Sequence, residues 1–156
     1  MNEIRPIQWS DGKLWLLDQT RLPLEEITLE LDRYQQAIDA IRDMQVRGAP
    51  AIGVTAGYAM AMAAREINAT SSGEYMSELE DAASRIAAAR PTAVNLFWAV
   101  QRMVSLAKSG PEPLGMPERL LAEAQRMYQE DEEINRKMGG LGKDLLPDGG
   151  AVLTHC

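Results

Sequence analysis

The pattern of apolar and polar positions along the chain changes its period near residue 32. Before that point, two short runs that each carry a tryptophan, residues 6–9 and 13–17, flank the tripeptide Ser10-Asp11-Gly12. Two such runs on either side of turn-forming residues are typical of a β-hairpin. Residues 27–31 alternate apolar and polar side chains, so they predict a third strand.

From residue 32 onward, the apolar positions repeat with the period of an α-helix. The first helical face consists of Tyr34, Ala37, Ile38, Ile41 and Met44. Residues 50–67 are apolar almost all round, which predicts a helix buried at the centre of the domain. Two further apolar faces predict helices over residues 75–87, ended by Pro91, and over residues 96–107, stopped by Ser109-Gly110-Pro111.

A long helix is predicted after a loop at residues 113–117. Its apolar stripe consists of Leu120, Leu121, Ala124, Met127, Tyr128, Ile134 and Met138. The acidic run at residues 130–133 indicates a solvated face, but Asp131 falls on the apolar stripe. Two interpretations of Asp131 remain open: a buried and paired carboxylate, or a helix face that is frayed or lies between domains.

The end of the chain has a different pattern. Residues 151–156 form an apolar run after Pro147-Asp148-Gly149-Gly150, which predicts a buried strand of a parallel α/β sheet. Such a strand needs neighbours on both sides, so we expect it to open a truncated second domain. Ligands bind outside the carboxyl ends of strands in these sheets, where Cys156 falls. The alternative for Cys156 is a buried, inert thiol.

Composition narrows the classes of protein. The 156 residues are 25% charged and carry a net charge of −7, which disfavours nucleic acid as a partner but permits an anionic metabolite. The N-terminus lacks the apolar core of a signal peptide, and residues 49–64 are too short and too rich in Ala and Gly to span a membrane. One cysteine and one histidine exclude a disulfide framework and disfavour a metal site. We expect a cytoplasmic protein without metal or a membrane partner.

Two arginines precede prolines at expected helix starts. Arg47 and Gly48 lie just before Pro50, and Arg90 lies directly before Pro91. A helix N-terminus offers free N–H groups and a positive dipole end to an anion, and an arginine can add a bidentate contact. Either segment alone is most simply a turn before a helix. Two such entrances in one chain favour a site for a phosphorylated ligand.

Four separated motifs carry a family resemblance. In chain order they are LLDQTRLP, VRGAPAIGVTAGYAMA, RPTAVNLFWAVQRM and GGAVLTHC. Together they resemble the methylthioribose-1-phosphate isomerases of methionine salvage over essentially the whole chain. The same superfamily contains ribose-1,5-bisphosphate isomerases and the regulatory α, β and δ subunits of the guanine-nucleotide exchange factor of translation initiation, and these two functions are the alternatives.

The resemblance implies an α+β domain of short β-strands followed by a helical bundle, residues 1–146. It implies that residues 147–156 are the first strand of a truncated Rossmann-like α/β domain. It further implies that Arg47, Gly48, Ala49 and Arg90 contact the phosphorylated methylthio-sugar and that Cys156 is catalytic, with no cofactor.

The family's catalytic aspartate would fall beyond Cys156, in the missing C-terminal segment. We therefore expect the isolated chain to be inactive and the complete protein to be a homodimeric aldose–ketose isomerase. Cys156 would act on the C1–C2 unit of the sugar, either as a base or as a stabiliser of a hydride shift.

Overall fold

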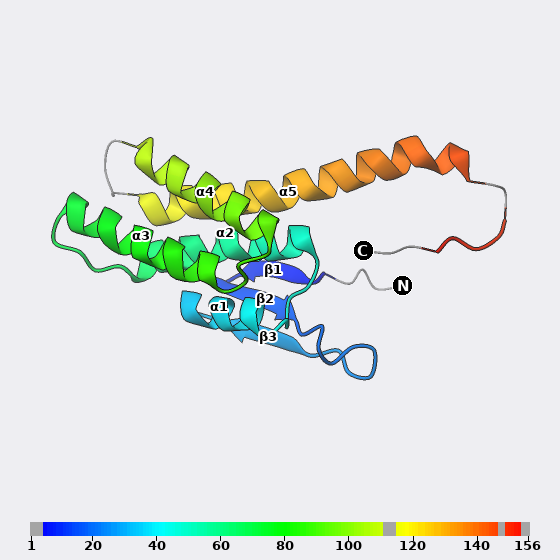
Figure 1. The fold of residues 1–156 in the computed structure, drawn as a ribbon, viewed down its shortest axis with the longest axis horizontal. Helices are drawn as coiled ribbons and strands as arrows, with labels where there is room; N and C mark the ends of the chain where they lie inside the picture. Colours follow the sequence, from blue (N-terminus) through cyan, green and yellow to red (C-terminus); the bar gives the residue numbers. More distant parts are fainter. Residues whose placement is uncertain (1–4, 111–114, 147–148, 154–156) are drawn as a thin grey trace.

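The computed structural model describes residues 5–110, 115–146 and 149–153 (Figure 1). Its elements, in chain order, are strands β1 (Ile7–Ser10), β2 (Lys13–Leu17) and β3 (Thr28–Leu31), helices α1 (Tyr34–Arg42), α2 (Ala49–Glu66), α3 (Ser72–Ala88), α4 (Val94–Lys108) and α5 (Met116–Gly142), and a 3₁₀ turn η1 (Lys143–Leu145). The small sheet followed by five helices confirms the α+β prediction. In the described ranges, no helix has the length and apolar character needed to cross a membrane.

The three strands form one antiparallel sheet in the order β1-β2-β3. Asp11 and Gly12 connect β1 to β2 with positive φ angles of 53° and 75°, as a type I′ hairpin requires. Leu14 and Leu16 on β2 are fully buried, because they point to the face of the sheet that the helices cover. The predicted hairpin and third strand are both confirmed.

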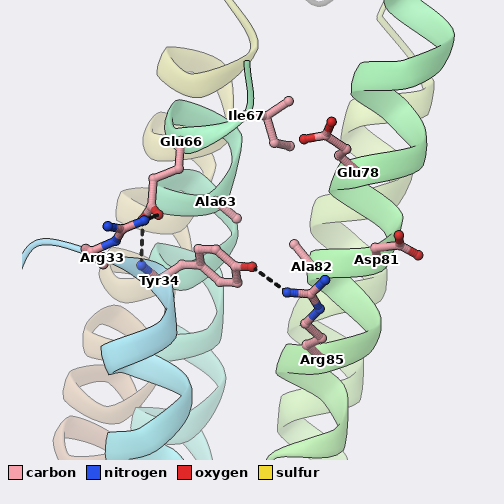
Figure 2. A pocket seen from close by; sticks show the side chains of 9 residues that line it. All are labelled: Arg33, Tyr34, Ala63, Glu66, Ile67, Glu78, Asp81, Ala82 and Arg85. Carbon is pink, nitrogen blue, oxygen red and sulfur yellow. Dashed lines mark hydrogen bonds and ion pairs between the residues drawn. The ribbon is translucent and has the colours of Figure 1, made fainter. Parts of the chain in front are cut away.

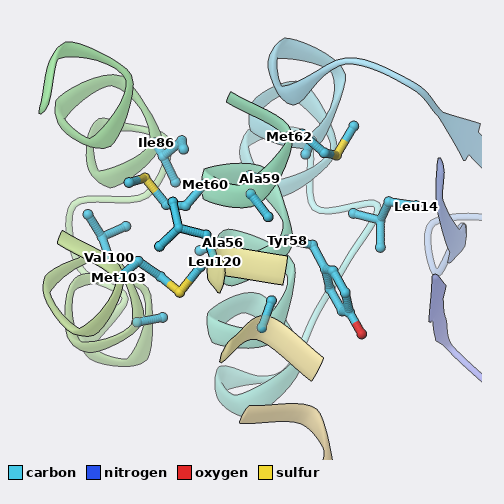
Figure 3. Close-up of a cluster of buried hydrophobic side chains, with 14 of the residues drawn as sticks. Leu14, Ala56, Tyr58, Ala59, Met60, Met62, Ile86, Val100, Met103 and Leu120 are labelled. Atoms are coloured by element: carbon cyan, nitrogen blue, oxygen red, sulfur yellow. The ribbon is translucent and has the colours of Figure 1, made fainter. Parts of the chain in front are cut away.

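Helix α2 is the centre of the domain. It is buried at 13 of its 18 residues and packs against α1, α3, α4 and α5. Met60 lies on the side of α2 that faces α3 and α4, whereas Tyr58 lies toward the sheet (Figure 3) and stacks on the Trp9 ring with centroids 5.4 Å apart. The prediction of a central buried helix is therefore confirmed.

Three element boundaries differ from the sequence prediction. Met44 was assigned to the first helical face, but α1 ends before it, and Met44 is exposed with a φ of 59°. Met116 and Pro117 belong to the first turn of α5 and not to a loop, since proline is well suited to a helix start. Helix α4 starts at Val94, three residues after Pro91.

The stripe of α5 is buried only in its first half. Leu120, Ala124 and Met127 pack into the core, whereas Ile134 is 63% exposed and Met138 is 61% exposed. Figure 1 shows the reason: the C-terminal half of α5 extends beyond the other helices. In the acidic run, residues 132–133 are solvated as predicted and residues 130–131 are half-buried.

The predicted strand at residues 151–156 is not formed in its described part. Residues 151–153 have no regular secondary structure and are exposed, and residues 154–156 lie outside the described part of the chain. A buried strand needs hydrogen-bonded neighbours, and none of the described residues pairs with this segment. The division into a domain of residues 1–146 and a strand of a second domain remains a prediction.

Leu120→Ala and Leu141→Ala test the two halves of α5, because Leu141, seven residues after Ile134, continues the apolar stripe. Leu120 is fully buried, so its truncation should lower the free energy of unfolding by about 2–5 kcal/mol. Leu141 is 74% exposed, and its truncation should change that free energy by less than about 0.5 kcal/mol. Urea denaturation followed by circular dichroism measures both. Equal losses would contradict the packing described here.

Candidate functional site at the entrances of helices α2 and α4

Two sequence motifs meet just before α2. After β2, the backbone N–H of Gln19 donates to the Gln45 carbonyl at 2.9 Å, and the Gln19 side-chain amide donates to the Arg47 carbonyl at 3.5 Å. The buried Asp18 carboxylate holds this loop, accepting from the Thr20 N–H at 3.0 Å and from the Thr20 hydroxyl at 2.6 Å. The LLDQTRLP segment thus fixes the loop that carries Arg47. Sequence reasoning used this motif for the resemblance but gave Asp18 and Gln19 no role.

Gly48 is the N-cap of α2, with φ 90° and ψ 130°. Side chains rarely tolerate that backbone conformation, so this position favours glycine. No side chain caps the helix, and its first turn contains no acidic residue. The first N–H groups of a helix have no partner within the helix. Because residues 47–50 are exposed, this positive helix end is accessible to an anion from solvent.

The Arg90 segment has a different geometry from the one predicted. Residues 90–93 form a turn in which the Ala93 N–H donates to the Arg90 carbonyl at 3.0 Å, so Pro91 does not open α4. Arg90 is half-buried in this turn. Proline is favoured at the second position of such turns, which explains why the helix begins later. The interpretation of Arg90 as directly preceding a proline-opened helix was wrong.

The entrances of α2 and α4 are nevertheless adjacent. A methyl group added to Gly53 on α2 would lie 3.0 Å from the Asn95 carbonyl oxygen, in the first turn of α4. Helix α4 also lacks a side-chain cap and an acidic first turn. Within the described part of the chain, neither the Arg47 nor the Arg90 guanidinium forms an ion pair. Both arginines therefore keep their charge available.

A cavity of about 400 Å³ lies beside these entrances, between α2, α4 and α5. Its apolar lining consists of Pro50, Val54, Val94, Trp98, Met127 and Ile134, and its polar lining of Asn95, Glu130 and Asp131. Asp131 accepts a hydrogen bond from the Asn135 amide at 3.2 Å. The stripe position of Asp131 thus places its carboxylate at this cavity, half-buried and without an ion pair to any described residue.

Arg102 fixes one wall of the cavity. Its Nη1 and Nη2 donate to the two Glu130 oxygens at 2.6 and 2.9 Å, and its Nε donates to the buried Glu123 at 2.6 Å. These hydrogen bonds raise the pKa of Arg102, and the bond from Arg102 lowers the pKa of Glu130. The guanidinium also lies 5.4 Å from the centre of the Trp98 ring. Sequence reasoning missed this cluster, although Glu123 and Glu130 are one heptad apart on α5.

A second, more polar cavity of about 330 Å³ lies between α1, α2 and α3 (Figure 2). Arg33 pairs with Glu66 at 3.2 Å, which leaves Arg85, a donor to the neutral Tyr34 hydroxyl at 3.2 Å, as the arginine of this lining without an ion pair. Glu78 and Asp81 add negative charge to the same lining. This cavity is therefore a poorer phosphate site than the entrances of α2 and α4.

Cys156, the predicted catalytic residue, lies outside the described residues, as do Thr154 and His155. Among the described residues, no three His, Cys, Asp or Glu side chains are grouped to hold a metal ion.

Both the sequence and the fold of this chain match known proteins. The chain belongs to the initiation factor 2 subunit family, whose model matches residues 45–156. A methylthioribose-1-phosphate isomerase of Pelotomaculum thermopropionicum is 46% identical over 96% of this chain and 42% of its own length.

Two solved structures share the fold. The 5-methylthioribose 1-phosphate isomerase of Pyrococcus horikoshii has a TM-score of 0.89 and 33% identity, covering 95% of this chain and 42% of that chain. The δ subunit of translation initiation factor eIF-2B from A. fulgidus has a TM-score of 0.85 and 41% identity, covering 94% and 43%. The chain spans less than half the length of these relatives. The resemblance inferred from the four motifs is confirmed.

Gly48→Ala should lower the free energy of unfolding by about 1–3 kcal/mol, because alanine is strained at a φ of 90°. Gly139→Ala is the matched control. Gly139 lies in α5 with open space around it, so alanine there should stabilise the helix by about 0.5–1 kcal/mol. Thermal and urea unfolding measure both variants. Changes of the same sign would contradict the assigned conformation of Gly48.

Glu130→Gln tests the Arg102 ion pair through pH. A carboxylate with a lowered pKa adds stability above its ordinary pKa of 4.5, and that stability is lost as the pH falls through the lowered value. The Glu130 side chain is 41% exposed, so the loss near pH 7 should be only about 0.5–1 kcal/mol. The difference from wild type should disappear below the lowered pKa. Denaturant unfolding between pH 3 and 7 measures it, and a constant difference would contradict the pairing.

Proposed function

We propose that the chain is the N-terminal, substrate-binding part of an enzyme that converts 5-methylthioribose 1-phosphate to 5-methylthioribulose 1-phosphate. The observation that carries this proposal is the 46% identity over 96% of the chain to a methylthioribose-1-phosphate isomerase. The solved isomerase with the same fold supports it. The reaction would serve methionine salvage in the cytoplasm.

In this proposal the phosphate binds at the entrance of α2. Arg47, Gly48, Ala49 and Arg90 hold it through backbone N–H groups and two guanidinium groups. Three features support this placement: the uncapped helix end, the absence of acidic residues in the first turns of α2 and α4, and the lack of ion pairs for both arginines among the described residues. The backbone conformation at position 48 favours glycine, and glycine places no side chain at the point where the phosphate would approach.

In the proposed reaction the bond from C1 to the ring oxygen breaks as that oxygen is protonated, a hydrogen moves from C2 to C1, and the C2 hydroxyl loses its proton as it becomes the carbonyl. The redox change is therefore internal to the sugar. Cys156 is proposed to act at the C1–C2 unit, as a base or as a stabiliser of a hydride shift. A region equivalent to the remaining length of the relatives supplies the acid, an aspartate. That region would also cover the exposed half of the α5 stripe, and the complete enzyme would be a homodimer.

The similarity to an eIF-2B δ subunit favours one alternative, a regulatory subunit without catalysis. Isomerase assays of the full-length protein with 5-methylthioribose 1-phosphate and ribose 1,5-bisphosphate separate the possibilities. Turnover of the first compound supports the proposal, and turnover of the second alone supports a ribose-1,5-bisphosphate isomerase. Turnover of neither, together with tight binding to a protein partner, supports the regulatory function.

Arg90→Ala and Arg47→Lys in the full-length enzyme test the phosphate site. Removing a charge-assisted hydrogen bond should cost about 1.5–3 kcal/mol, which lowers kcat/KM roughly 10- to 150-fold. Arg47→Lys should also lower kcat/KM, because lysine keeps the charge but lacks the planar fork of arginine. Arg136→Ala is the control: its side chain is 72% exposed on α5 and pairs with Glu132. Unchanged kcat/KM in folded Arg90→Ala would rule out its role.

A further inference from the structure

We propose that the cavity between α2, α4 and α5 receives the apolar C5 substituent of the sugar and sets the specificity of the enzyme at that position. This inference rests on the proposed isomerase function. It adds a second contact region beside the phosphate site. The side chains that form this region are not among those that the family resemblance implies for the substrate.

The position of the cavity fits a ligand that is anchored at the helix entrance. Pro50, which lines the cavity, directly follows Ala49 at the proposed phosphate site. Val94 and Asn95 line it from the first turn of α4, whose backbone lies against Gly53 of α2. A sugar whose phosphate lies at the entrance of α2 can therefore extend its other end into the cavity.

The lining suits a methylthio group. Val54 and Met127 form a buried apolar surface, and Trp98 offers an aromatic face that is about half exposed. Thioether sulfur packs well against apolar side chains and gains from contact with aromatic rings. The volume of about 400 Å³ exceeds that of a methylthio group, so the adjoining carbons of the sugar fit as well.

The charge of the cavity lining determines which end of the ligand enters the cavity. The cavity is lined by two carboxylates, Glu130 and Asp131, and by no lysine or arginine. Arg102 already pairs with Glu130, so a phosphate inside the cavity would meet the Asp131 carboxylate, whereas sugar hydroxyls can donate to Asp131. The phosphate therefore stays at the helix entrances, and the uncharged end occupies the cavity. The same argument disfavours a 1,5-bisphosphate, whose second phosphate would have to occupy this space.

Two variants of the full-length enzyme test the inference. Val94→Trp adds bulk at the rim of the cavity, and Trp98→Ala removes one wall. The readout is the ratio of kcat/KM for 5-methylthioribose 1-phosphate to that for 5-deoxyribose 1-phosphate, which lacks only the methylthio group. We expect the wild-type ratio to be about 10 or more, because small apolar groups in a fitted pocket discriminate by that order.

Val94→Trp should lower the ratio at least about fivefold, mainly through the methylthio substrate, and Trp98→Ala should lower it toward 1. Ser105→Trp is the matched control, since Ser105 is exposed on the same helix as Val94 and Trp98 and does not line the cavity, and it should leave the ratio unchanged. Circular dichroism and the activity on the 5-deoxy substrate report folding. If both folded cavity variants keep the wild-type ratio, the inference is overturned and the isomerase function stands. If the wild-type enzyme turns over neither sugar phosphate, both proposals fail.

Discussion

The burial of α2 on all sides is the constraint on which the rest of the structure depends. A helix with 13 buried residues can be stable only if other elements cover every face, and here α1, α3, α4 and α5 do so while the sheet packs against Tyr58. Its apolar surface drives this arrangement. Because the helix is held from all directions, its N-terminal end has a fixed position, and the loop carrying Arg47 is fixed with it.

The same packing brings polar groups to the end of the helix. Gly53 allows the first turn of α4 to lie against α2, so two positive helix ends are neighbours. Arg102 on α4 joins this helix to α5 by binding Glu123 and Glu130, and it neutralises Glu130 in the lining of the cavity. The positive and the apolar surfaces of the candidate site are thus separate but adjacent, which suits a ligand with one charged and one apolar end.

The strands and the central helix could be predicted from the sequence because local patterns determine them: a turn of Asp11 and Gly12 between apolar runs, and a long stretch without a polar face. The start of α2 just after Arg47 and Gly48 could be predicted for the same reason, since the proline of a helix start is visible in the sequence. The turn at Arg90 could not be predicted, because proline suits both a helix start and a turn. The Arg102 cluster depends on how α4 and α5 pack, which local patterns do not contain.

The interpretation of α5 shows what a periodic pattern can and cannot determine. Leu120, Met127, Ile134 and Leu141 are spaced by seven residues, so they lie on one stripe of the helix. Sequence alone assigns that stripe to one interface, but α2 covers only its first half. The second half contains Gly139, Gly140 and Gly142, each of which weakens a helix by about 1 kcal/mol relative to alanine. A helix that is intrinsically weak and apolar on one face gains stability when a partner covers that face, which agrees with the proposed role of the additional region found in the longer relatives.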